Sequence, residues 1–150
     1  MKKIILVGII TATTILTSCS SFKDKGLNDY YSYYNKNVNK VKVPPILLNV
    51  LAGKKELKPI LKYIQTAELI TITNVNAKMD KNLTSAITFD QFQKYMNFNL
   101  AGELITLYGI ENNDVISNLI FKIQNGNEIK LVDAKVNLPI EEFNKILVNL

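Results

Sequence analysis

The 150-residue chain contains no histidine, arginine or tryptophan, and its single cysteine is Cys19. Histidine is the commonest general base and metal ligand, so its absence weighs against both kinds of site. One cysteine can neither form an internal disulfide nor supply a four-ligand zinc site. Without arginine, the chain lacks the guanidinium group that binds phosphate or guanine in a bidentate manner. Abundant Asn and Ile and an all-lysine set of cations indicate biased codon usage, which reduces the functional weight of these absences.

The thirteen acidic residues form no recognisable catalytic or metal-binding pattern. Adjacent Glu141 and Glu142 point in different directions in the first turn of a predicted helix, where they favour the helix dipole. Asp80, Glu111 and Asp114 fall in predicted loops and lack the regular oxygen-ligand spacing of a calcium loop. No nucleophile elbow or glycine-rich phosphate loop occurs. We therefore expect a protein that is not an enzyme and that needs no cofactor and no metal.

The first 18 residues have the pattern of a signal peptide. Lys2 and Lys3 precede thirteen apolar or small residues at positions 4–16. A helix of that length spans about 20 Å, which is short of the roughly 30 Å hydrocarbon core of a bilayer. We therefore expect a signal peptide at residues 1–18 and not a membrane-spanning helix.

The residues that follow resemble the lipobox of bacterial lipoproteins: Leu16, Thr17, Ser18 and Cys19. The resemblance implies that the Cys19 thiol receives diacylglycerol and that cleavage before it leaves 132 residues. Two or three acyl chains would then anchor the protein stably in the membrane. Ser20, in place of the aspartate that retains lipoproteins in the inner membrane, implies an outer-membrane protein facing the periplasm. The alternative interpretation is a buried free cysteine in an ordinary helix.

We expect residues 19–26 to form a flexible tether and residues 27–150 a single domain. Tyr30, Tyr31, Tyr33 and Tyr34 lie within five residues at its start. On a helix, three of them share one face, where they either cap the core with their hydroxyls in water or form a contact patch for a glycan or a protein. Residues 22–62 carry a net charge of +6, which either favours anionic headgroups or is an ordinary solvated surface.

The first half of the domain is predicted to mix short strands and helices. The patterns indicate strands at residues 38–43 and 68–74, and helices at residues 45–51 and 56–65. A loop is expected after the second strand, from residue 75 to residue 83. A further helix is predicted from two signals. Thr88 and Gln91 fit a capping box. Phe89, Phe92 and Met96 recur at helical spacing.

The second half is predicted to form a three-strand meander followed by a helix. The strands are expected at residues 103–110, 115–124 and 128–138, and the helix begins after Pro139. The apolar phase of the third strand slips by one residue, which predicts a β-bulge near Leu131 and Val132. The fold class is therefore α+β, with a mainly antiparallel sheet of about five strands and helices packed on one face.

From residue 30 to the end, the chain resembles the small envelope lipoproteins grouped as domain of unknown function 4252. The residues that carry the resemblance are Leu119-Ile120-Phe121-Lys122, Lys130-Leu131-Val132 and Val136-Asn137-Leu138-Pro139. That family brings no established activity and no catalytic residues.

The sequence thus favours a noncatalytic protein-interaction or accessory module, held to the membrane through a lipid on Cys19. We expect an envelope protein as its partner and no binding of nucleic acid. The alternative is a periplasmic carrier of a small apolar ligand, bound between sheet and helices.

Overall fold

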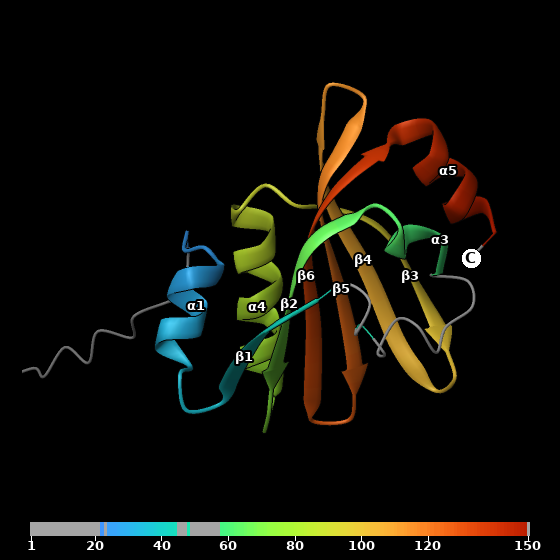
Figure 1. Ribbon diagram of the computed structural model, residues 1–150. Helices are drawn as coiled ribbons and strands as arrows, with labels where there is room; N and C mark the ends of the chain where they lie inside the picture. Colours follow the sequence, from blue (N-terminus) through green and yellow to red (C-terminus); the bar gives the residue numbers. More distant parts are fainter. Residues whose placement is uncertain (1–21, 23, 45–47, 49–57, 150) are drawn as a thin grey trace, which may run out of the picture.

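The computed structural model describes residues 22, 24–44, 48 and 58–149. Within them the chain forms an α+β fold, in which a six-stranded antiparallel sheet is flanked by four helices (Figure 1). The strands lie in the order β1-β2-β6-β5-β4-β3. In sequence the elements are α1 (Leu27–Tyr33), β1 (Val38–Val43), α3 (Lys58–Leu61), β2 (Ile64–Ile72), α4 (Ala77–Phe89), β3 (Gln93–Leu100), β4 (Glu103–Asn112), β5 (Val115–Asn125), β6 (Glu128–Pro139) and α5 (Ile140–Val148). The predicted α+β class is confirmed, with six strands instead of about five.

Strands β3 to β6 form an antiparallel meander joined by tight turns. The predicted strands at residues 103–110, 115–124 and 128–138 and the helix after Pro139 are confirmed as β4, β5, β6 and α5. Ala101 and Gly102 in one turn have φ values of 53° and 82°, and Asn113 and Asp114 in the next have 49° and 61°. Positive φ at both central residues gives the backbone twist that two-residue hairpins need.

Both faces of the sheet are buried, because side chains along each strand alternate between two hydrophobic clusters. In β5, Leu119 and Phe121 belong to one cluster and Ile120 to the other. In β6, Val132 and Ala134 alternate in the same way with Ile129 and Leu131. The sheet is therefore the middle layer of the domain.

The helices divide between these two faces. Helices α1 and α4 lie on one side of the sheet, and α3 and α5 lie on the other (Figure 1). Tyr30 of α1 and Leu83 of α4 are fully buried in one cluster, and Ile60 of α3 and Phe143 of α5 are fully buried in the other. The expected packing of helices on one face thus describes α1 and α4, and the two helices α3 and α5 cover part of the second face.

The prediction for residues 75–96 is wrong in its details. Residues 77–83, expected to be in a loop, lie in α4, and residues 93–96, expected to be in a helix, lie in β3. The helix is capped at its N-terminus by Asn76, whose side chain accepts a hydrogen bond from the Met79 backbone N–H at 2.9 Å. Thr88 is not a helix cap, because its hydroxyl donates to the Thr84 carbonyl within α4. Asp80, expected in a loop, therefore lies in the first turn of this helix.

The predicted β-bulge near Leu131 and Val132 is also wrong. The pairing of β6 with β5 and with β2 runs through both residues without a shift. Leu131 and Val132 point to opposite faces of the sheet, and each is buried in a different cluster. Two adjacent apolar residues therefore occur here without any change of register.

The strand predicted at residues 38–43 is confirmed as β1, whereas the helix predicted at residues 56–65 is shorter. The described part of it is α3, and β2 already begins at Ile64. The helix predicted at residues 45–51 lies outside the described residues apart from Leu48.

Candidate functional site

A hollow of about 780 Å³ opens beside strands β1, β2, β5 and β6. Most of the residues that line it are charged or polar, including Lys42, Glu68, Asp133, Lys135, Thr66 and Asn118, and Val43, Pro44 and Ala67 add an apolar part. We call it the polar hollow. Glu68 alternates with Ala67 and Leu69, and Asp133 with Val132 and Ala134, so both carboxylates lie on the sheet face that carries α1 and α4.

The strand register arranges these side chains in two rows. Lys42 of β1, Glu68 of β2 and Asp133 of β6 are direct cross-strand neighbours. In the next row, Thr66 and Asn118 lie on either side of Lys135. The register shifts beside this row, between Ile64 and Thr66 in β2 and between Ile116 and Asn118 in β5. Such irregularities re-aim side chains and often border binding sites.

The two carboxylates of the polar hollow are direct cross-strand neighbours. Neither Glu68 nor Asp133 forms an ion pair or a side-chain hydrogen bond with any described residue. Like charges directly opposite across two strands destabilise a sheet. Burial raises the pKa of the Asp133 carboxyl from 3.8 to about 6, and the charge of Glu68 acts in the same direction against Lys40 and Lys135.

A second polar group lies next to these carboxylates. Tyr31 is only 8% exposed, and its hydroxyl has no hydrogen-bond partner among the described residues. Burial and the negative charges of Asp133 and Glu68 raise the pKa of this hydroxyl. The Lys40 ammonium lies 3.7 Å from the centre of the Tyr31 ring. Asp90 accepts a hydrogen bond of 2.9 Å from the Leu27 backbone N–H and so fixes the start of α1 close to this group.

The four predicted contact tyrosines differ in their exposure. Tyr30 and Tyr31 are 0% and 8% exposed, whereas Tyr33 is 57% exposed and Tyr34 is partly buried. The Tyr34 hydroxyl accepts a hydrogen bond from Asn82 at 2.8 Å. The expectation that all hydroxyls on the helix face stay in water is wrong, because the Tyr30 hydroxyl is buried without a partner among the described residues.

Phe22 completes an aromatic cluster with these tyrosines. Its ring is 8% exposed and lies 5.7 Å from the Tyr30 ring, 6.0 Å from the Tyr33 ring and 6.4 Å from the Tyr34 ring, measured between centroids. These separations are in the range of favourable aromatic pairs. Phe22 falls within the predicted tether, so packing on the domain already begins there.

A smaller hollow of about 380 Å³ continues this aromatic cluster onto α4. It is lined by Phe22, Asp24, Thr84, Ser85, Thr88 and Phe89. Phe89 is 54% exposed, which is unusual for a phenylalanine. We define the α1–α4 surface as the region around Phe22, Tyr33, Tyr34 and Phe89.

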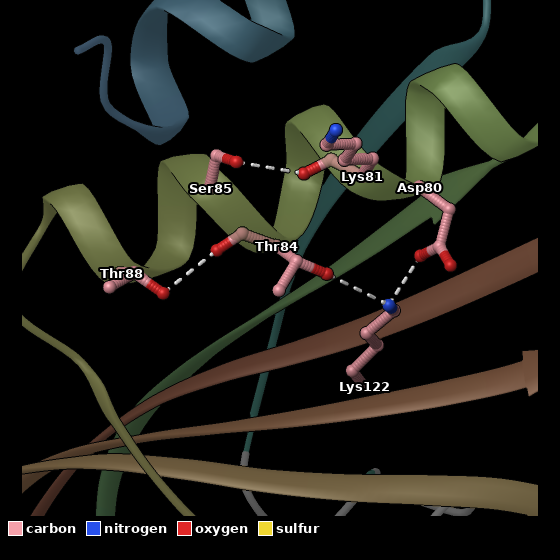
Figure 2. Close-up of polar contacts among 6 residues, drawn as sticks. All are labelled: Asp80, Lys81, Thr84, Ser85, Thr88 and Lys122. Atoms are coloured by element: carbon pink, nitrogen blue, oxygen red, sulfur yellow. Dashed lines mark hydrogen bonds and ion pairs between the residues drawn. The ribbon is translucent and has the colours of Figure 1, made fainter. Parts of the chain in front are cut away.

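A third polar group lies between α4 and the sheet (Figure 2). Lys122 of β5, with its side chain 8% exposed, forms an ion pair with Asp80. Its ammonium also donates to the Thr84 hydroxyl at 3.4 Å. Both partners come from α4, so this group fixes the helix on the strand. We therefore assign it a structural role.

The predicted lipidation site lies outside the described residues. Leu16, Thr17, Ser18 and Cys19 all belong to the part of the chain that the structure does not describe. In the part it does describe, no helix has the length and apolar character needed to cross a membrane. Those residues also contain no cluster of three or more acidic side chains that could hold a metal ion.

Sequence reasoning missed the charged residues of the polar hollow. Asp133 interrupts a buried strand between Val132 and Ala134, which was the one available signal. Its position opposite Glu68 depends on a pairing between strands that are 65 residues apart in sequence. Residue patterns within single strands do not contain that register.

Comparison with known proteins adds no relative. No family model matches the chain, and neither a curated protein nor a solved structure is significantly similar to it.

Proposed function

We propose that this chain is a bacterial lipoprotein, acylated at Cys19, whose domain is a noncatalytic interaction module for an envelope protein. The anchor is supported by the lipobox that ends at Cys19, and the position of Phe22 relates this anchor to the domain. This residue packs on α1 only three positions after Cys19. Three residues span at most about 10 Å. An acylated Cys19 would therefore hold α1 close to the membrane surface.

The destination follows from the same proposal. The lipobox at Leu16, Thr17, Ser18 and Cys19 gives the anchor, and Ser20 favours the outer membrane, with the domain facing the periplasm. The resemblance to domain of unknown function 4252 is part of this proposal and adds no chemistry to it.

The α1–α4 surface is the best candidate for the partner contact. Tyr33 and Phe89 are more than half exposed, and aromatic side chains are enriched in protein interfaces. Because Tyr30 and Tyr31 are buried, the contact proposed for the four tyrosines narrows to Tyr33 and Tyr34. A lipid anchor confines this surface to the membrane, which raises its effective concentration towards a partner held there.

The alternative is a carrier of a small apolar ligand. Val43, Pro44 and Ala67 give the polar hollow an apolar part, but the lysine, carboxylate and amide groups that also line it suit a polar ligand better.

The anchor is tested by replacing its only thiol. Cys19→Ala should abolish metabolic labelling by fatty acid and move the protein from the membrane fraction to the soluble fraction, because acylation needs that sulfur. Ser20→Ala, one residue away, should keep both properties. A Cys19→Ala variant that still labels and sediments would contradict the proposal.

The partner contact is tested on the full-length protein purified from detergent-solubilised membranes. The double variant Tyr33→Ser/Phe89→Ser should lose a co-purifying envelope protein that the wild type retains. Val148→Ser is the control, since Val148 is 87% exposed on α5, on the other side of the sheet. Equal recovery from all three proteins, or no partner from any, would reject the contact.

A further inference from the structure

We infer that the polar hollow binds a small zwitterion, a free amino acid or a short peptide, with its ammonium group at Glu68 and Asp133 and its carboxylate at Lys135 and Lys42. This goes beyond the proposed function, since the polar hollow is distinct from the α1–α4 surface and does not depend on the anchor.

The carboxylate pair provides the first half of the site. Glu68 and Asp133 are direct neighbours across β2 and β6, where strands lie about 4.8 Å apart. Two carboxylates at this spacing repel each other, and no described residue forms an ion pair with either. A primary ammonium carries three donors and one positive charge, so it can bridge both groups.

The lysines provide the second half. Lys42 is the cross-strand neighbour of Glu68, and Lys135 lies two residues beyond Asp133 on the same strand. Two residues along a strand correspond to about 6.6 Å. The ammonium groups of both lysines lie on flexible stems and are exposed, so they can meet a carboxylate bound next to the acidic pair.

Neutral polar groups complete the lining. Thr66 and Asn118 flank Lys135 and offer a hydroxyl and an amide for hydrogen bonds to a ligand's peptide or carboxylate groups. The volume of about 780 Å³ lies within the usual range for sites that hold small ligands. It is large enough for a tripeptide as well as for a single amino acid.

The buried Tyr31 does not line the polar hollow, but its hydroxyl is a further polar group under the influence of the two acids. Tyr31 is more than nine-tenths buried, its hydroxyl lacks a partner among the described residues, and its strongest charged neighbour is Asp133. Buried polar groups usually have a hydrogen-bond partner, and an unsatisfied one calls for an explanation. An ordered water between this hydroxyl and Asp133 would supply one.

The test is calorimetric titration of the full-length protein in detergent with two probes, L-alanine and trialanine. At least one should bind saturably at millimolar or lower concentration, and the stronger probe distinguishes the free amino acid from the peptide. N-acetylation or C-terminal amidation of that probe should each weaken binding by about tenfold or more, because each removes one charged contact. Absence of binding by both probes, or equal binding of the blocked forms, would overturn the inference.

Three variants connect the binding to the polar hollow. Asp133→Asn and Lys135→Gln should each weaken the affinity by about tenfold. Glu128→Gln should leave it unchanged, since Glu128 lies on the same strand but pairs with Lys130 at 3.2 Å, away from the polar hollow. Thermal unfolding of each variant shows whether it is folded. If Asp133→Asn and the wild type bind the probe with equal affinity, the probe binds outside the polar hollow and the inference is overturned.

Discussion

Asp133 illustrates how one side chain can cost stability and still fit a function. It lies in the middle of β6, opposite Glu68, and has no ion-pair partner among the described residues. A folded chain gains nothing from two unpaired carboxylates in this position, whereas a cationic group of a ligand would gain from both. Groups that lower stability in the free protein are common at binding sites.

Because the pKa of Asp133 is raised, the loss of folding stability caused by its charge depends on pH. The folded-state pKa of about 6 exceeds the ordinary value of 3.8, so the folded protein binds this proton more tightly than the unfolded chain. The resulting stabilisation is fully present below about pH 4 and is lost as the pH rises to about 6. The groups that act on Asp133 are Glu68, Lys40, Lys135 and Asp90.

Asp133→Asn should therefore stabilise the protein at pH 7.5, by up to about 3 kcal/mol, because the neutral amide avoids the cost of the buried charge. At pH 4 the variant and the wild type should unfold at nearly the same urea concentration. Equilibrium urea unfolding at both pH values measures this. A variant that is less stable than the wild type by the same amount at both pH values would show that Asp133 has a structural role.

The alternation of side chains along one strand can be predicted from the sequence, but the residue that lies opposite on the neighbouring strand cannot. The sequence predicts that the tyrosines lie on a helix, as Tyr30, Tyr31 and Tyr33 do in α1, but the exposure of each ring depends on how α1 packs on α4. The opposition of Glu68 and Asp133 likewise depends on the pairing of β2 with β6. Both are tertiary properties, which local patterns do not contain.

At the scale of elements, α4 is where local signals misled most. Its apolar residues Met79, Leu83, Ala86 and Ile87 follow a helical spacing, but the five polar residues in the range 76–82 indicate a loop. The helical spacing of Phe92 and Met96 is a coincidence, since Phe92 directly precedes the edge strand β3 and Met96 lies in it. By contrast, the alternating patterns of β4 and β5 and the amphipathic α5 were sufficient to predict these elements.

The contact of α4 with β5 yields a prediction about a buried charge. Lys122 is charged and almost completely buried, and Asp80 is its ion-pair partner. Asp80→Ala should destabilise the protein by about 3 kcal/mol, because it leaves the lysine charge unpaired. In a Lys122→Met background the same change should cost less than about 1 kcal/mol, since no buried charge remains.

Urea unfolding of the two single variants and the double variant measures this coupling. Lys145→Met is the control background, because Lys145 pairs with Glu142 on the exposed side of α5. An equal cost of Asp80→Ala in the wild-type and Lys122→Met backgrounds would mean that the ion pair does not hold α4 on the sheet.

At the scale of the whole molecule, the distance in sequence between paired strands decides which parts of the fold the sequence predicts. The C-terminal meander and helix form through contacts between neighbours in sequence, so their patterns are informative. Strands β1 and β2 join the far edge of β6 through long-range pairing, so the number of strands and the coverage of both faces follow only from the structure.

The proposed orientation also belongs to this scale. The described chain begins at Phe22 on the side of α1 and α4, whereas α5 lies on the opposite side of the sheet (Figure 1). If Cys19 is the anchor, the α1–α4 surface lies near the membrane, and α5 lies farther from it.

The mass of the intact protein extracted from membranes tests the central claim most directly. The account predicts a chain of 132 residues that begins at Cys19 and carries a diacylglyceryl group, with or without a third acyl chain on its amino terminus. A membrane-extracted protein that retains residues 1–18, or that carries an unmodified Cys19, would contradict it.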